Sequence, residues 1–158
     1  NGGYFNYDYS NLLEKFDQGD SLSPKQLVCL YYGATIAGGY KPYKTMAMEN
    51  RITVLTDRTE YNDALALCDS ILKYRPTSPM ALMEKSFILR KLRDTTKAKQ
   101  YVKQFRMIKE TILKSGDGKT PETAYIVTSR KDIDIINSHN HYMVIKAKEK
   151  LYTSKLKI

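Results

Sequence analysis

The sequence contains no tryptophan, and it has two cysteines and two histidines among its 158 residues. No apolar run approaches the roughly 20 residues that a membrane-spanning helix needs, so we expect no transmembrane segment in this chain. The two cysteines can form at most one disulfide and lack the paired CxxC spacing of structural zinc sites. Cys29 and Cys68 both lie in apolar helical contexts, which favours buried thiols.

The motifs of common catalytic classes are also missing. The chain has no Gly-x-Ser-x-Gly motif, and neither cysteine lies in an activating context. Residues 118–120 read GKT, like the end of a phosphate-binding loop, but Leu113 replaces the first glycine of that motif and Pro121 blocks the helix that should follow. We therefore expect neither catalytic residues nor a cofactor.

The two histidines, His139 and His141, could face the same side of a strand. Metal sites need three or four ligands, and no Cys, Asp or Glu lies beside the histidines in sequence. Asp132 and Asp134 could complete a ligand set in space, but on a helix these two side chains point apart. We expect a polar connection here and no metal site.

The formal net charge is +9, and the basic residues are concentrated between residues 79 and 119. The basic face at residues 97–114 could bind nucleic acid or another polyanion. A charged outer face is, however, typical of any solvated helix, and the aromatic-glycine motifs of RNA-binding sheets are missing. We therefore keep nucleic acid only as the alternative partner, behind a protein or peptide.

Helical periodicity dominates the first 115 residues. A short apolar edge near the start ends at Gly19, and Ser23 to Gln26 then read as a capping box with proline at the first helical position. Ser78 and Pro79 show the same pair, an N-cap serine followed by proline, and predict a second helix start. After the short N-terminal element, the spacing of apolar residues predicts helices at residues 24–37, 45–56, 60–75, 79–93 and 95–114.

The predicted helices form pairs with a constant period. Pro42 and Pro76 are 34 residues apart, and so are Ala64 and Ala98. Units at residues 11–44, 45–78 and 79–112 resemble the tetratricopeptide repeat, a helix-turn-helix module of this length. The resemblance implies a mainly α fold of stacked helix pairs over residues 1–115.

The pattern changes after Ser115. Residues 116–118 predict a turn, and residues 124–128, rich in aromatic and β-branched side chains, predict a strand. A short helix is expected at residues 130–137, and the alternation between residues 142 and 158 predicts two more strands. Residues 116–158 should thus form a small C-terminal β (α+β) extension, strand-helix-strand-strand, packed on the helices.

The stretch LYYGATIAGGYKPY at residues 30–43 raises the possibility of a glycine-rich phosphate loop. Such a loop precedes a helix, whereas these glycines follow one, so we interpret Gly38 and Gly39 as a helix C-cap. The helix end leaves three tyrosines unexplained, and these could line an aromatic pocket: Tyr32, Tyr40 and Tyr43.

This stretch and SGDGKTPETAYIV at residues 115–127 resemble signatures of a secreted bacterial family of Gram-negative gut anaerobes, domain of unknown function 4919. The resemblance implies an exported protein, periplasmic or associated with the outer membrane, with a possible lipid anchor in its precursor. The missing initiator Met agrees with a removed leader. The resemblance implies no activity and no catalytic residues.

The usual geometry of the repeat places one set of apolar and basic side chains on its concave face: Met80, Met83, Phe87, Arg90 and Lys91. Met and aromatic side chains beside cations suit a peptide-binding groove. Alternatively, the C-terminal extension covers Met83 and Phe87 and makes them core. The sequence therefore predicts a non-enzymatic module that binds a protein or peptide.

Overall fold

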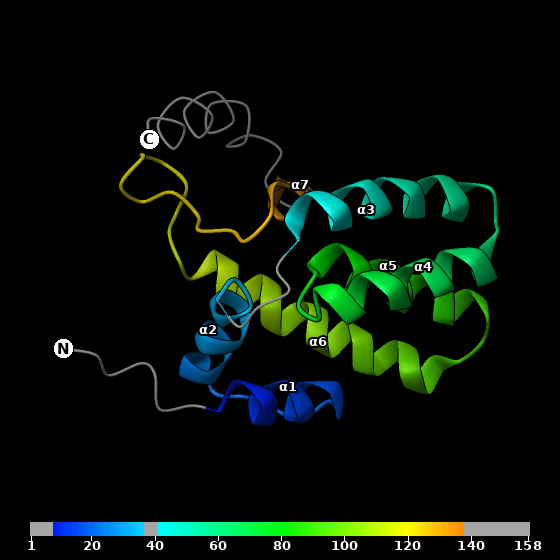
Figure 1. Ribbon diagram of the computed structural model, residues 1–158, viewed down its shortest axis with the longest axis horizontal. Coiled ribbons are helices and arrows are strands. Elements are labelled where there is room, and N and C mark those ends of the chain that lie inside the picture. Colours follow the sequence, from blue (N-terminus) through cyan, green and yellow to red (C-terminus); the bar gives the residue numbers. More distant parts are fainter. Residues whose placement is uncertain (1–7, 37–40, 138–158) are drawn as a thin grey trace.

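A computed structural model describes residues 8–36 and 41–137, and this part of the chain is all-helical (Figure 1). None of the described residues forms a β-strand. Seven helices follow one another: α1 (Tyr9–Asp17), α2 (Pro24–Gly33), α3 (Pro42–Asp57), α4 (Tyr61–Tyr74), α5 (Pro79–Lys91), α6 (Thr95–Leu113) and α7 (Arg130–Asn137).

The predicted helix starts at Ser23 and Ser78 are confirmed. Gln26 N donates to Ser23 Oγ at 3.4 Å, and Ser23 N donates to Gln26 Oε1 at 2.9 Å, which completes the capping box of α2. Ala81 N donates to Ser78 Oγ at 3.2 Å at the start of α5. Both helices have proline at their first position, where a missing N–H costs no intrahelical bond.

The boundary between α2 and α3 differs from the prediction. Helix α2 ends at Gly33, and the next turn is closed by Ile36 N, which donates to Gly33 O at 2.9 Å. Pro42 lies at the first position of α3, whereas Pro76 follows the end of α4. Proline is tolerated both at the first position of a helix and just after its end. The spacing of 34 residues between Pro42 and Pro76 therefore does not mark equivalent positions in two repeats. Gly38, Gly39 and Tyr40 lie outside the described residues.

From α3 to α6, each helix packs against the next one along the chain (Figure 1). The turns of the α3–α4 and α5–α6 hairpins match. Thr59 and Arg93, 34 residues apart, both have positive φ, of 59° and 67°. Glu60 N donates to Leu55 O, and Asp94 N donates to Leu89 O, both at 2.9 Å.

The alanines that follow these two turns are both buried, Ala64 at 0% and Ala98 at 2% relative exposure. Each alanine N–H also makes the equivalent bond, to Glu60 O and Asp94 O respectively, at 3.0 Å. The two hairpins thus start their second helices in the same way.

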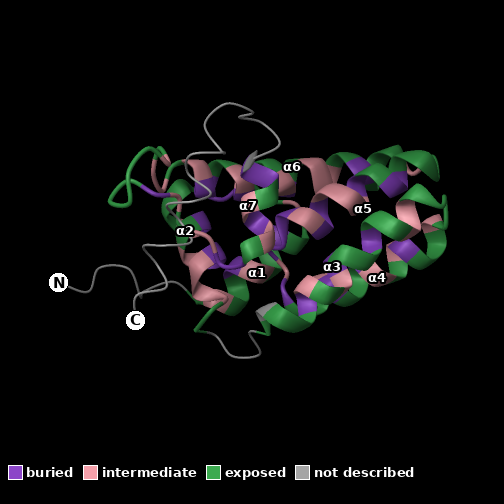
Figure 2. Cartoon of the chain, turned by 90° about the horizontal axis from the view of Figure 1, so that it is seen from above, coloured by how far each residue is buried: buried purple, intermediate pink, exposed green. Residues whose placement is uncertain are grey.

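Two apolar clusters lie between the helices, where buried residues face inward (Figure 2). One cluster joins α1 and α2 to α6 and includes Phe16, Leu30 and Ile108. The other joins α3, α4 and α5 and includes Ile52 and Cys68. Helix α2 packs on α6, and α7 packs on α3, α5 and α6, so distant parts of the sequence complete the core.

The predicted strand at residues 124–128 is wrong: the segment has no strand beside it among the described residues, and two of its backbone N–H groups donate to side chains. Ile126 N donates to Ser115 Oγ at 2.8 Å, and Thr128 N donates to Tyr31 OH at 3.1 Å. The predicted turn before it is present, since the N–H groups of Asp117 and Gly118 both donate to Thr123 O. The predicted helix at residues 130–137 is confirmed as α7, and the strands expected after residue 142 lie outside the described residues.

Candidate functional site

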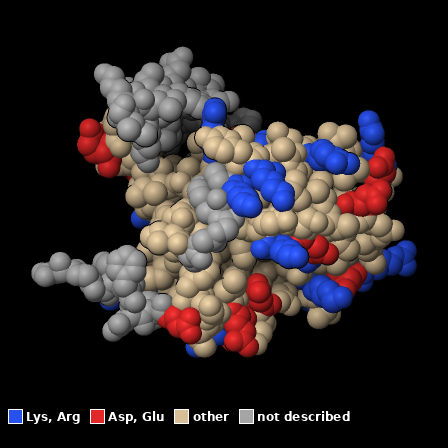
Figure 3. All heavy atoms as spheres, viewed as in Figure 1, with Lys and Arg blue, Asp and Glu red and all other residues tan. Residues whose placement is uncertain are grey.

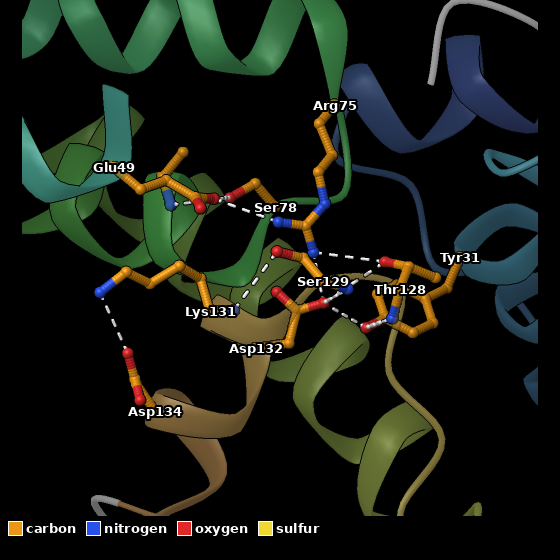
Figure 4. A network of polar contacts seen from close by, with 10 residues as sticks. Tyr31, Glu49, Arg75, Ser78, Thr128, Ser129, Lys131, Asp132 and Asp134 are labelled. Atoms are coloured by element: carbon orange, nitrogen blue, oxygen red, sulfur yellow. Dashed lines mark hydrogen bonds and ion pairs between the residues drawn. The ribbon is translucent and has the colours of Figure 1, made fainter. Parts of the chain in front are cut away.

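A network of buried polar side chains joins four separate parts of the fold (Figure 4). Tyr31 comes from α2, Glu49 from α3, and Arg75 from the turn that follows α4. Asp132 comes from the first turn of α7. Relative exposure is 1% for Glu49, 2% for Arg75 and 0% for Asp132, so three charged groups lie in the interior.

Arg75 lies between the two carboxylates. Its Nη1 atom is 3.1 Å from Glu49 Oε1, and its Nη2 atom forms an ion pair with Asp132 Oδ2. Ser78 Oγ donates to the same Glu49 oxygen at 2.6 Å. A guanidinium that satisfies two carboxylates at once uses the forked donor geometry peculiar to arginine.

Asp132 also accepts hydrogen bonds from α2 and from the loop before α7. Tyr31 OH donates to Asp132 Oδ2 at 2.5 Å, and Ser129 N donates to the same oxygen at 3.2 Å. Since Tyr31 OH in turn accepts from Thr128 N, the network fixes the entry of the chain into α7.

Burial and charge act against each other in this network. Burial raises the pKa of Glu49 above its ordinary value, and the Arg75 cation and the Ser78 hydroxyl offset part of that rise. Burial alone would lower the pKa of Arg75, but the adjacent Asp132 and Glu49 carboxylates raise it, so the guanidinium stays charged. Burial and the Asp132 charge together raise the pKa of Tyr31.

The network holds helices together and is closed to solvent. With exposures of 2% or less, its charged groups have no surface that a substrate could contact. Asp134 is exposed and pairs with Lys131 at 3.1 Å, so it points away from buried Asp132, as the sequence predicted. Among the described residues no three His, Cys, Asp or Glu side chains are grouped as metal ligands, and His139 and His141 lie outside this part of the chain.

A solvent-accessible groove of about 610 Å³ follows α6. Ala98, Val102 and Met107 give its floor an apolar character. Four cations and one carboxylate also line it: Arg90, Lys99, Lys103, Arg106 and Glu110. We call this feature the α6 groove.

The charge of the α6 groove is largely uncompensated. Arg90, Lys99 and Arg106 are exposed, and none of them forms an ion pair with another described residue. Lys103 Nζ donates to Gly19 O at 2.7 Å, which holds that cation beside the turn after α1. The face of the molecule in Figure 3, where α3 and α4 lie, instead carries basic and acidic side chains side by side.

A smaller hollow of about 260 Å³ extends the α6 groove toward α2. Both features are lined by Lys103, Met107 and Glu110, so they are contiguous. On the α2 side, Leu27 and Val28 make the wall of the hollow apolar, and Val28 is 39% exposed. We call this extension the α2–α6 hollow.

The five residues predicted for the concave face all lie on α5. Met80 and Met83 are half-buried, and Phe87 is 38% exposed with Lys91 Nζ 5.2 Å from its ring centre. Arg90 instead lines the α6 groove. The spacing of three and four residues on α6 can be read from the sequence. The sequence around α6 does not indicate that Arg90 and α2 border this stripe.

The tyrosines proposed as an aromatic pocket lie in different environments. Tyr32 packs edge-on against Tyr31, with ring centres 4.8 Å apart, and its hydroxyl donates to Ile126 O at 3.1 Å. Tyr43 is 81% exposed at the start of α3. Tyr32 therefore ties α2 to the loop before α7.

The cysteines Cys29 and Cys68 form no disulfide with each other. Cys68 is buried, as predicted, and burial together with the nearby Glu84 charge raises the pKa of its thiol to about 12. Cys29 is half-buried. No described helix combines the length and apolar character required to cross a bilayer.

Residues 4–155 match the model of a protein family described as a domain of unknown function, DUF4919. No curated protein and no solved structure shows a significant match to the chain. The family assignment thus covers nearly the whole sequence, and the site has to be interpreted from its own geometry.

Proposed function

The chain belongs to the DUF4919 family, whose description names no activity, and we propose that it is a non-enzymatic module that binds an acidic segment of a partner protein in the α6 groove. The observation that carries this proposal is the charge balance of the groove, where four cations and one carboxylate surround an apolar floor. An acidic segment with apolar side chains complements both the rim and the floor.

A nucleic acid or another polyanion is the alternative occupant, because the cations of the basic face at residues 97–114 supply much of the rim. Binding of single-stranded nucleic acid relies on aromatic side chains on which bases stack. None of the described residues that line the groove is aromatic. Ala98, Val102 and Met107 instead offer contact area to aliphatic side chains, which favours a peptide.

We also propose that the two hairpins are tetratricopeptide-like repeats. The matching turns at Thr59 and Arg93, and the buried alanines that follow them, support this relationship. In such an array Met80, Met83, Phe87 and Lys91 would form a contact surface on α5 beside the groove.

We further propose that the protein is exported, to the periplasm or the outer membrane, as the sequence signatures of the family imply. The amino acids encoded before Asn1 test this directly. A cleavable leader followed by a lipidation cysteine supports export, whereas a cytoplasmic start without a leader contradicts it.

Charge reversal in the groove tests the binding proposal. We expect the double variant K99E/R106E to bind a fluorescein-labelled glutamate- and leucine-rich peptide at least about tenfold more weakly than the wild type, in fluorescence anisotropy. The matched control is R51E/K73E, which reverses one Arg and one Lys exposed on α3 and α4. Equal loss in both double variants would show that only net charge matters and would contradict a site in the groove.

A further inference from the structure

We infer that the α6 groove and the α2–α6 hollow together bind one amphipathic α-helix of the partner, acidic on its flanks and with a bulky apolar side chain that enters the hollow. This inference rests on the proposed function and specifies the conformation and chemistry of the bound segment. Four structural observations support it.

The first observation is the shape of the combined site. Its residues on α6 and at the C-cap of that helix run from Thr95 to Lys114 at spacings of three and four, so they form one continuous stripe of a single helix. At about 1.5 Å per residue the stripe is roughly 29 Å long. A partner helix of about 20 residues would span it, whereas an isolated side chain or a small ion would occupy a small part.

The second observation concerns the modes of peptide recognition. A peptide that binds as an added strand needs an exposed sheet edge, and none of the described residues forms a strand. A helix that binds in a groove instead needs an apolar floor. Small residues in that floor let the two helix axes approach to about 8–10 Å, the usual separation of packed helices. Ala98 and Val102 provide such a floor.

The third observation is that the molecule already docks a helix on this part of α6. Helix α2 packs against α6, with Leu27 in the shared core. The exposed side of the same α2 turn, at Val28, forms the wall of the hollow. A partner helix in the groove would therefore lie beside α2 and pack on α6 as α2 does.

The fourth observation is the distribution of charge along the stripe. Arg90 and Lys99 line the groove toward the start of α6, and Lys103 and Arg106 line it around the middle of the helix. The hollow toward the end of α6 adds the apolar side chains of Leu22 and Val28, together with one further cation, Lys114. The partner helix should therefore carry carboxylates along its whole length and its large apolar residue opposite the end of α6, where Leu22 and Val28 lie.

Three synthetic peptides of equal length test the inference. The first has leucines at i, i+3, i+4 and i+7 among glutamates, the second has the same residues with leucines at alternate positions, and the third has proline in place of one central residue of the first. We expect the first peptide to bind the full chain at least about tenfold more tightly than the other two in fluorescence anisotropy. We also expect its helical circular dichroism signal to increase on binding.

A substitution in the hollow adds a second readout. Val28→Glu introduces a charge into the wall of the hollow, and we expect it to weaken binding of the first peptide about tenfold. Val54→Glu is the matched control, because Val54 is also exposed, at 47%, but lies on α3. Thermal unfolding of both variants establishes that they remain folded.

The outcomes separate the inference from the proposed function. If all three peptides bind equally and K99E/R106E weakens all of them, the groove binds acidic segments and the helical inference is wrong. If no peptide binds, or if a DNA duplex competes with the first peptide at equal affinity, the proposed function fails as well. Equal effects of Val28→Glu and Val54→Glu would overturn the role of the hollow.

Discussion

The guanidinium of Arg75 lies 3.1 Å from the carboxylate of Glu49, although 26 residues separate the two in the sequence. Both side chains are almost completely buried, and the second arm of the guanidinium pairs with Asp132 on α7. This relationship joins the turn before α5 to α3 and α7. Because a buried charge is stable only with its partners in place, the network makes the position of each helix depend on the others.

Replacing Arg75 with methionine should destabilise the protein strongly. The variant R75M leaves Glu49 and Asp132 buried without their shared cation, and breaking a buried pair in this way costs about 3–5 kcal/mol. Urea unfolding at pH 7 measures the loss in free energy of unfolding. The control R51M changes an exposed arginine on α3 and should remain within about 0.5 kcal/mol of the wild type. A loss below about 1 kcal/mol in R75M would contradict this account of the network.

The stability of the wild type relative to E49Q should fall as pH rises above 4.5, the ordinary pKa of this carboxyl group. Burial raises the pKa of Glu49, so the folded chain holds this proton more tightly than the unfolded chain does. Its contribution to stability is thus complete at acid pH and is lost as pH rises through the raised pKa. Urea unfolding of both proteins between pH 4 and 8, in steps of about one unit, measures the difference.

Other acidic groups with raised pKa values, such as Glu84 and Asp17, are present in both proteins and cancel in that comparison. A difference that stays constant, or that increases in favour of the wild type as pH rises, would contradict the direction of the Glu49 shift.

Ser78 and Ser23 both cap helices, but their loss should have unequal effects. The variant S23A removes an exposed cap of α2 and should cost about 1 kcal/mol. The variant S78A removes the cap of α5 and also the 2.6 Å bond to the buried Glu49 carboxylate, so we expect about 2–3 kcal/mol. Equal losses in urea unfolding would show that the bond to Glu49 adds nothing to the cap.

Replacing Gly116 with alanine should destabilise the loop after α6. A Cβ atom at Gly116 would lie 2.3 Å from Thr123 O and 2.8 Å from Ala124 O, and these backbone atoms cannot move without shifting the turn. We expect a loss of about 1–3 kcal/mol in thermal or urea unfolding. The control is Gly33→Ala, where the Cβ would meet the ring of Tyr9 at 3.3 Å and that side chain can adjust. A loss no larger than that of the control would contradict the close approach at Gly116.

Features that depend on residues close together in the chain could be predicted from the sequence. The caps at Ser23 and Ser78 and helix α7 are set by contacts over three or four positions, and the structure has them where they were expected. The segment at residues 124–128 has the composition of a strand, but a strand also needs a second strand to pair with. Its N–H groups at Ile126 and Thr128 instead donate to Ser115 Oγ and Tyr31 OH. The amino-acid composition of a segment does not show whether a second strand lies beside it in the fold.

By itself, the sequence determined the helices of the described chain, most of their ends, and the concentration of positive charge on α6, because these follow from local periodicity and from the side chains present. Only the tertiary structure decided that Asp132 meets Tyr31 across 101 residues and Arg75 across 57. It also decided that Arg90 and Val28 border the same stripe of α6. The physical reason is that buried charges and grooves depend on which distant surfaces pack together, and packing is a property of the whole chain.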